Sequence, residues 1–127
     1  MSKMWGIGAY WGRDKSVEFQ RDNFVEIGWD SKEAPALYEM FSRIEPHDII
    51  YIKSKPPGRR LFIKAVGIAQ DKPDGGKVKV EWLVKDSTYI HDISAEEGRY
   101  NVYNLTLYEE LNPTIRWKIK GLLDFAR

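Results

Sequence analysis

Two tryptophans at the ends of predicted strands, Trp11 and Trp29, are the residues of this chain best suited to binding a flat ligand. A nucleobase stacks on an aromatic side chain, and each such stack is worth roughly 1–3 kcal/mol. Two indole rings on opposite sides would hold a base that has left its own stack. The competing interpretation is that both rings belong to a hydrophobic core, and the pattern alone favours neither.

Polar side chains near these tryptophans could read the edge of a base, because a pocket discriminates through a few hydrogen-bonding partners. Asp30 and Ser54 lie at such positions, although Asp30 fits better as a helix cap and Ser54 also suits a turn. Tyr10 and Tyr51 could wall the pocket, but tyrosine is equally ordinary on a half-buried strand. The predicted base-binding pocket comprises Trp11, Trp29, Asp30, Tyr10, Tyr51 and Ser54.

Basic residues gather in two predicted loops that could share one rim and contact phosphates. Solvated loops are the commoner explanation for such runs, and the balance of 20 Lys and Arg against 19 Asp and Glu leaves a net charge of only +1. A protein that held DNA mainly through phosphate neutralisation would be more basic, so any recognition must be local. The predicted phosphate-contacting residues are Arg13, Lys53, Lys55, Arg59 and Arg60.

The pair His47-Asp48 invites a catalytic interpretation, because histidine titrates near neutrality. No serine or cysteine lies in a recognisable nucleophile elbow, and His47 follows Pro46, which favours a turn. The chain has no cysteine and two histidines, without metal-ligand spacing. We therefore expect no metal, no cofactor and no enzymatic activity.

Alternation of apolar and polar residues predicts the strands that must position these side chains. The predicted strands span residues 4–11, 24–29, 48–54, 60–70, 77–85 and 100–107, and the segments 12–23 and 86–99 are predicted loops. In the strand 77–85, Val78, Val80, Trp82 and Val84 face inward. Trp5 and Trp82 are predicted core residues, whereas Trp117 is expected in packing or on the surface.

Two amphipathic segments predict helices. One is expected to start at Asp30 and to present Leu37, Met40, Phe41 and Ile44 as one stripe before Pro46. The other follows the cap Asn112-Pro113. Hairpins dominate the order of elements, so we expect one α+β domain over residues 1–127. Its sheet should form a small curved mixed or antiparallel β-barrel with two to three helices, and a ligand would bind at the mouth of the filled barrel.

The segment from Trp29 to Asp71 resembles the EVE branch of the PUA-like superfamily, whose relatives are the YTH and ASCH domains. The matching motifs are an early tryptophan (Trp5), a tryptophan before a helix (Trp29), and a strand opening with a Gly-Asp pair and carrying Tyr and Ser. Here that strand reads from His47 to Ser54, with His47 in place of the glycine, and the next family strand matches residues 62–69.

The resemblance implies a PUA-like barrel whose aromatic pocket receives a flipped-out or unpaired base, often a modified one. It also implies a partner nuclease or other effector, because EVE-like modules often accompany defence nucleases. The predicted function is therefore non-enzymatic binding of a base in DNA or RNA. A protein-interaction or inhibitor module, and a small enzyme acting on a nucleotide or on RNA through His47 or Asp48, are the alternatives. No apolar run suggests a membrane span or signal peptide, so a cytoplasmic location is expected.

Overall fold

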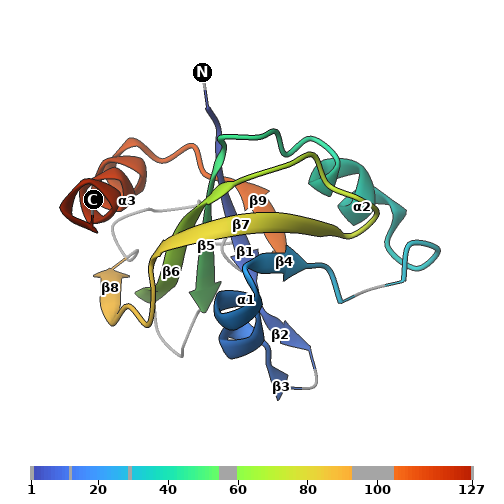
Figure 1. Ribbon diagram of the computed structural model, residues 1–127, viewed down its shortest axis with the longest axis horizontal. Helices are drawn as coiled ribbons and strands as arrows, with labels where there is room; N and C mark the ends of the chain where they lie inside the picture. The colour runs from blue at the N-terminus through green and yellow to red at the C-terminus, as the bar shows by residue number, and fades with distance from the viewer. Residues whose placement is uncertain (1, 12, 29, 55–59, 93–104, 127) are drawn as a thin grey trace.

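A strongly curled mixed β-sheet forms a half-barrel, against which the three helices of the described part of the chain pack (Figure 1). The computed structural model describes residues 2–11, 13–28, 30–54, 60–92 and 105–126. The predicted fold class, an α+β protein built on a small curved barrel with few helices, is confirmed.

The main sheet has the strand order β4-β7-β6-β5-β1-β9, with β8 also paired to β6. Among the strands of the described residues, only β1 and β5 run parallel, and the other neighbours pair antiparallel. The C-terminal ends of these two strands therefore lie side by side at the same end of the sheet. The strands are β1 (Met4–Gly8), β4 (Phe24–Glu26), β5 (Ile49–Ser54), β6 (Arg60–Ala69), β7 (Lys77–Val84), β8 (Tyr89–Asp92) and β9 (Leu107–Glu109).

Several predicted strand boundaries were wrong. The first strand ends at Gly8, and the chain then forms a separate two-stranded ribbon, β2 (Tyr10–Trp11) with β3 (Arg13–Asp14). The strand β8 lies within the segment predicted as a loop. Of the predicted strand 100–107, only Leu107 belongs to β9, and residues 100–104 lie outside the described residues.

The helix α1 (Ser16–Asp22) occupies a segment that was predicted to be a loop. Its composition is polar, but Phe19 is 1% exposed and fills the core, and Gln20 is also buried. The helix ends at Asn23, whose left-handed backbone (φ 58°) suits a C-cap. Tertiary burial of one large ring thus outweighs a weak helical pattern.

The helix α2 (Pro35–Phe41) begins later than predicted. The carboxylate of Asp30 accepts a hydrogen bond from the backbone N–H of Lys32 (2.7 Å), and its carbonyl closes a separate turn with Ala34. Asp30 is therefore a turn residue and not the N-cap of this helix. The proline at the first helical position sets the start instead, because its fixed φ suits that position.

The helix α3 (Pro113–Ala126) begins as predicted. The side-chain carbonyl of Asn112 accepts a hydrogen bond from the backbone N–H of Ile115 (3.1 Å), which satisfies one of the free donors of the first turn. Ile115, Ile119 and Leu123 are buried along one face. This face holds the helix against the sheet.

Alternation along the strands divides the buried residues into two clusters. The interior core lies inside the half-barrel and includes Trp5, Ile52, Phe41 and Trp82, while the α3-side core lies on the outer face beneath α3 and includes Tyr51 and Tyr108. Trp5 and Trp82 are 1% and 5% exposed, so their predicted place in the core is confirmed.

Candidate nucleic-acid interface

The common edge at which β1 and β5 end gathers several of the predicted site residues. Gly8, the last residue of β1, is in register with Lys53, and Ser54 ends β5. The strand β6 starts at Arg60 beside them, and the β2–β3 ribbon follows directly on β1 at the same end of the molecule (Figure 1). We call this region the barrel end; its described members are Tyr10, Arg13, Lys53, Ser54 and Arg60.

The two faces of the sheet separate the basic side chains of the barrel end. Ser54 pairs with Phe62, so Ser54 and Arg60 belong to the inner face, with Ser54 half-buried and Arg60 exposed. Lys53 belongs to the outer face and is 8% exposed, and its Nζ lies 5.7 Å from the centre of the Tyr108 ring. Lys53 therefore presents little surface to a phosphate, whereas Arg60 is open to one.

The β2–β3 ribbon presents Tyr10 to solvent, with 74% of the residue exposed. Trp11 lies beside it in β2, paired in register with Arg13, and its side chain is outside the described part of the structure. Arg13 is also exposed, but its guanidinium donates to Glu18 Oε1 at 3.2 Å. The ribbon thus offers one open aromatic ring and a basic group that already has an acidic neighbour.

A contact across 50 positions fixes this ribbon to the main sheet. Lys64 Nζ on β6 donates to Asp14 Oδ2 at 2.8 Å, and the backbone N–H of Ser16 donates to Asp14 Oδ1 at 2.9 Å. Partial burial acts to raise the pKa of Asp14, but these hydrogen bonds outweigh it and lower the pKa below 3.8. Asp14 therefore remains a carboxylate, and through it the ribbon that carries Tyr10 is tied to β6.

Tyr51 does not face the barrel end. It is fully buried, and its hydroxyl lies 2.6 Å from the hydroxyl of Tyr108 while donating to Glu110 Oε1, also at 2.6 Å. Burial, together with the neighbouring Tyr108 and Glu110, raises the pKa of Tyr51 well above 10.0. Tyr51 thus belongs to a neutral-hydroxyl network in the α3-side core and offers no surface to a ligand.

The remaining predicted pocket and phosphate residues are not drawn together by any described contact. The described hydrogen bonds of Asp30 are local to its own turn. Trp29, Lys55 and Arg59 lie outside the described residues, so their proposed roles stay predictions.

In the described contacts, His47 and Asp48 form hydrogen bonds that join segments of the fold. The buried carboxylate of Asp48 accepts hydrogen bonds from Trp5 Nε1 (3.0 Å) and from the backbone N–H groups of Lys3 and Glu45 (both 2.9 Å). It therefore ties the start of β1 to the turn after α2. His47 has a left-handed backbone (φ 77°) and donates its N–H to Ala69, which confirms its predicted place in a turn.

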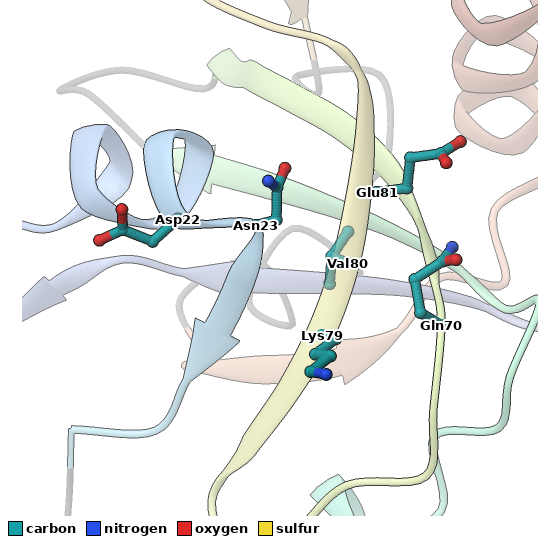
Figure 2. A pocket seen from close by; sticks show the side chains of 6 residues that line it. All are labelled: Asp22, Asn23, Gln70, Lys79, Val80 and Glu81. Atoms are coloured by element: carbon teal, nitrogen blue, oxygen red, sulfur yellow. The ribbon is translucent and has the colours of Figure 1, made fainter.

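An open cleft of about 380 Å³ lies away from these residues, where α1 and β4 meet β7. Asp22, Asn23, Gln70, Lys79, Val80 and Glu81 line it. Figure 2 shows the carboxylates of Asp22 and Glu81 pointing to opposite sides, so the lining groups do not converge on a ligand. Within the described ranges, no cluster of His, Asp and Glu could hold a metal ion.

Sequence reasoning missed two long-range contacts, the Lys64–Asp14 pair that ties the β2–β3 ribbon to β6 and the Glu110 network around Tyr51. Each joins residues 50 or more positions apart. No local motif signals such a contact, because its formation depends on the strand order.

No protein-family model matches the chain, and no curated protein matches its sequence. The solved NMR structure of Rpa0253 from Rhodopseudomonas palustris is similar in fold, with a TM-score of 0.56 over 95% of this chain and 94% of that chain. The two sequences are 14% identical, so the likeness concerns the fold alone. Among the described helices, none combines the length and apolar character needed to cross a bilayer.

Proposed function

We propose that this chain is a nucleic-acid-binding module that holds one base at the barrel end, without chemical change to the base. The observation that supports the proposal is the exposure of the Tyr10 ring on a ribbon that follows β1, the strand that runs parallel to β5 and ends in register with it, and that the Lys64–Asp14 pair ties to β6. Tyr10 offers a stacking surface, Ser54 an edge hydrogen bond and Arg60 a phosphate contact. Trp11 and Trp29 complete the proposed pocket.

The resemblance to EVE domains supports this proposal through one backbone detail. The family has a glycine where this chain has His47, and His47 adopts a positive φ of 77°, a conformation that favours glycine. The turn that opens β5 is thus compatible with the family motif despite the substitution. Membership of the PUA-like superfamily and a preference for a modified base are parts of the proposal.

Binding is best measured by fluorescence anisotropy of labelled single- and double-stranded oligonucleotides, with and without modified bases. Anisotropy is preferable to tryptophan quenching, because Trp117 is 70% exposed on α3, on another side of the molecule (Figure 1). Removing one stacking ring should cost roughly 1–3 kcal/mol of binding free energy. We therefore expect Tyr10→Ala and Trp29→Ala to weaken binding by about five- to 150-fold.

Lys85→Ala is the matched control, because Lys85 is an exposed basic residue outside the barrel end. It should change binding by less than about twofold, as expected for one charge that touches no phosphate. Equal losses from Lys85→Ala and Tyr10→Ala would contradict a stacking pocket. The absence of binding to every oligonucleotide would refute the proposed function altogether.

A further inference from the structure

A row of three side chains crosses the inner face of the sheet at the barrel end. Ser54 of β5 is in register with Phe62 of β6, and Phe62 is in register with Ile90 of β8. In-register residues of neighbouring antiparallel strands point to the same face, with Cα atoms about 4.5–5.5 Å apart. We call Ser54, Phe62 and Ile90 the inner row.

The inner row contains apolar surface that the described cores leave open. Phe62 is half-buried and Ile90 is 41% exposed, and among the described residues both lie outside the interior core and the α3-side core. By contrast, Leu61 and Ile63, the neighbours of Phe62 along the strand, are 0% and 1% exposed and belong to the α3-side core. Packing therefore uses the outer face of this part of β6 and leaves the inner face accessible.

The two polar contacts of the proposed function flank Phe62. Ser54 lies directly across from it, and Arg60 lies two residues before it on the same face of β6, roughly 6.5 Å along the strand. A nucleotide whose base reaches Ser54 while its phosphate reaches Arg60 therefore passes over Phe62. We propose that the base stacks on the ring of Phe62, with Ile90 as an apolar wall beside it. This inference rests on the proposed function and adds the residues that contact the face of the base.

A β-bulge next to the inner row ties the ribbon to the same strand. The register of β5 and β6 shifts beside Lys64, which is the extra residue of the bulge. Lys64 donates to Asp14, and Asp14 is in register with Tyr10, so Asp14 and Tyr10 share one face of the ribbon. That face is bound to β6 two residues from Phe62. The proposed base therefore lies between Phe62 on the sheet and Tyr10 on the ribbon.

The composition of the inner row predicts which bases bind best. Phe62 and Ile90 offer apolar surface, and Ser54 alone offers a side-chain hydrogen bond. Affinity should therefore follow the area of the base more than the pattern of its edge, which favours purines over pyrimidines. A single strand should bind more tightly than a duplex, because a paired base must first leave its stack.

Fluorescence anisotropy with labelled single strands of about ten nucleotides tests this proposal. The wild type should bind oligo-dA more tightly than oligo-dT, and a strand of abasic sites more weakly than either. Phe62→Leu keeps an apolar side chain but removes the flat ring, so it should weaken binding of oligo-dA by about five- to 150-fold. Phe62→Trp should keep the wild-type affinity or raise it, because indole also stacks.

Phe24→Leu is the matched control for Phe62→Leu. Phe24 is also a half-buried phenylalanine, but it lies on β4, where its ring centre is 5.0 Å from that of Phe19 in the interior core. This variant should leave the affinity for oligo-dA unchanged, even where it lowers the stability of the fold.

Methyl-labelled isoleucine gives a second readout, which needs no change to Phe62. The δ1-methyl NMR signal of Ile90, assigned with Ile90→Val, should shift when oligo-dA is added, because a base on Phe62 brings its ring current close. Ile68 is the internal control, since it is half-buried on the outer face of β6 and packs against the α3-side core. Its signal should not move.

Wild-type affinity of Phe62→Leu for oligo-dA, or an unmoved Ile90 signal, would overturn the inference. The proposed function would then still stand, with stacking supplied by Tyr10 and Trp29. Equal affinity for oligo-dA and the abasic strand would mean that phosphates alone are bound, and would refute both. A shift of the Ile90 signal on concentrating the protein without oligonucleotide would assign the inner row to a contact between copies instead.

Discussion

The two cores of this protein lie on opposite faces of one sheet and are built from different chemistry. The interior core is almost wholly apolar, and its indole N–H groups are satisfied at its margins, Trp5 by Asp48 and Trp82 by the carbonyl of Phe19. The α3-side core instead contains two hydrogen-bonded tyrosine hydroxyls, Tyr51 and Tyr108, and that of Tyr51 donates to Glu110, which is 2% exposed.

The two cores therefore differ in what they contribute to the fold. Apolar packing has little directionality, and it disfavours a one-residue slip only because the slip would turn the apolar side chains of a strand to the other face. The hydroxyl network is directional, and it joins β5 to β9 through Tyr51 and Tyr108. The ring of Tyr108 also lies over Gly6, where an added Cβ would come within 2.5 Å of it. The α3-side core therefore fixes β9 against β1.

The largest expected effect comes from a cavity in the interior core. Phe41→Ala removes a ring that is 0% exposed, and such truncations cost about 3–5 kcal/mol of unfolding free energy. Urea unfolding followed by circular dichroism measures the loss. Leu111→Ala is the control, because Leu111 is 67% exposed and should change stability by less than about 0.5 kcal/mol. Equal losses would show that the interior core is not the main source of stability.

A smaller effect is expected when the α3-side network loses one hydroxyl. Tyr51→Phe keeps the ring but leaves Glu110 without the donor at 2.6 Å, which should cost about 1–3 kcal/mol. Tyr10→Phe is the matched control, since Tyr10 is exposed. If Tyr51→Phe leaves the free energy of unfolding unchanged, the network orients the side chains but does not stabilise the fold.

The same variant carries a pH signature. The folded pKa of Tyr51 is raised above 10.0, so the unfolded chain releases this proton more readily. The contribution of Tyr51 is therefore complete below pH 10.0 and is lost as the pH rises above that value. We expect the stability difference between the wild type and Tyr51→Phe to shrink in that range. A difference that stays constant would contradict the raised pKa.

The smallest effect is expected at the Lys64–Asp14 pair, which belongs to neither core. Its side chains are 30% and 45% exposed, so Asp14→Asn should cost at most about 1 kcal/mol. Because the folded pKa of Asp14 lies below 3.8, its contribution is present above that pH and is lost as the pH falls further. Unfolding midpoints of the wild type and Asp14→Asn should converge in acid. A loss of unfolding free energy as large as that of Phe41→Ala would show that the Lys64–Asp14 pair stabilises the fold as much as a core residue does.

The parts of the fold with strong periodicity were predictable from sequence. Val78, Val80 and Trp82 alternate along β7, and Ile115 and Ile119 mark the buried face of α3. The helix α1 was not predictable, because one buried ring, Phe19, decides it. Sequence patterns over a few residues indicate local structure only. The helix α1 is instead stabilised by packing of Phe19 in the core of the half-barrel.

The candidate site was predictable only in outline. Tyr10 was predicted in the first strand but lies in the separate β2–β3 ribbon. Nothing near Tyr51 in the sequence indicates that its hydroxyl binds Glu110, 59 positions later. Whether a tyrosine side chain is exposed or buried depends on which strand pairs beside its own. Exposure of a single aromatic residue is therefore a property of the topology.

The position of β1 between β5 and β9 has a consequence for how the chain reaches this state. Trp5 is in register with Glu109, so one edge of β1 cannot pair until Glu109, far along the chain, has left the ribosome. At roughly 5–20 residues per second, the first strand waits for several seconds with an apolar, unpaired edge. Such an edge is a template for aggregation. Slow or chaperone-dependent maturation during synthesis would follow from the topology alone.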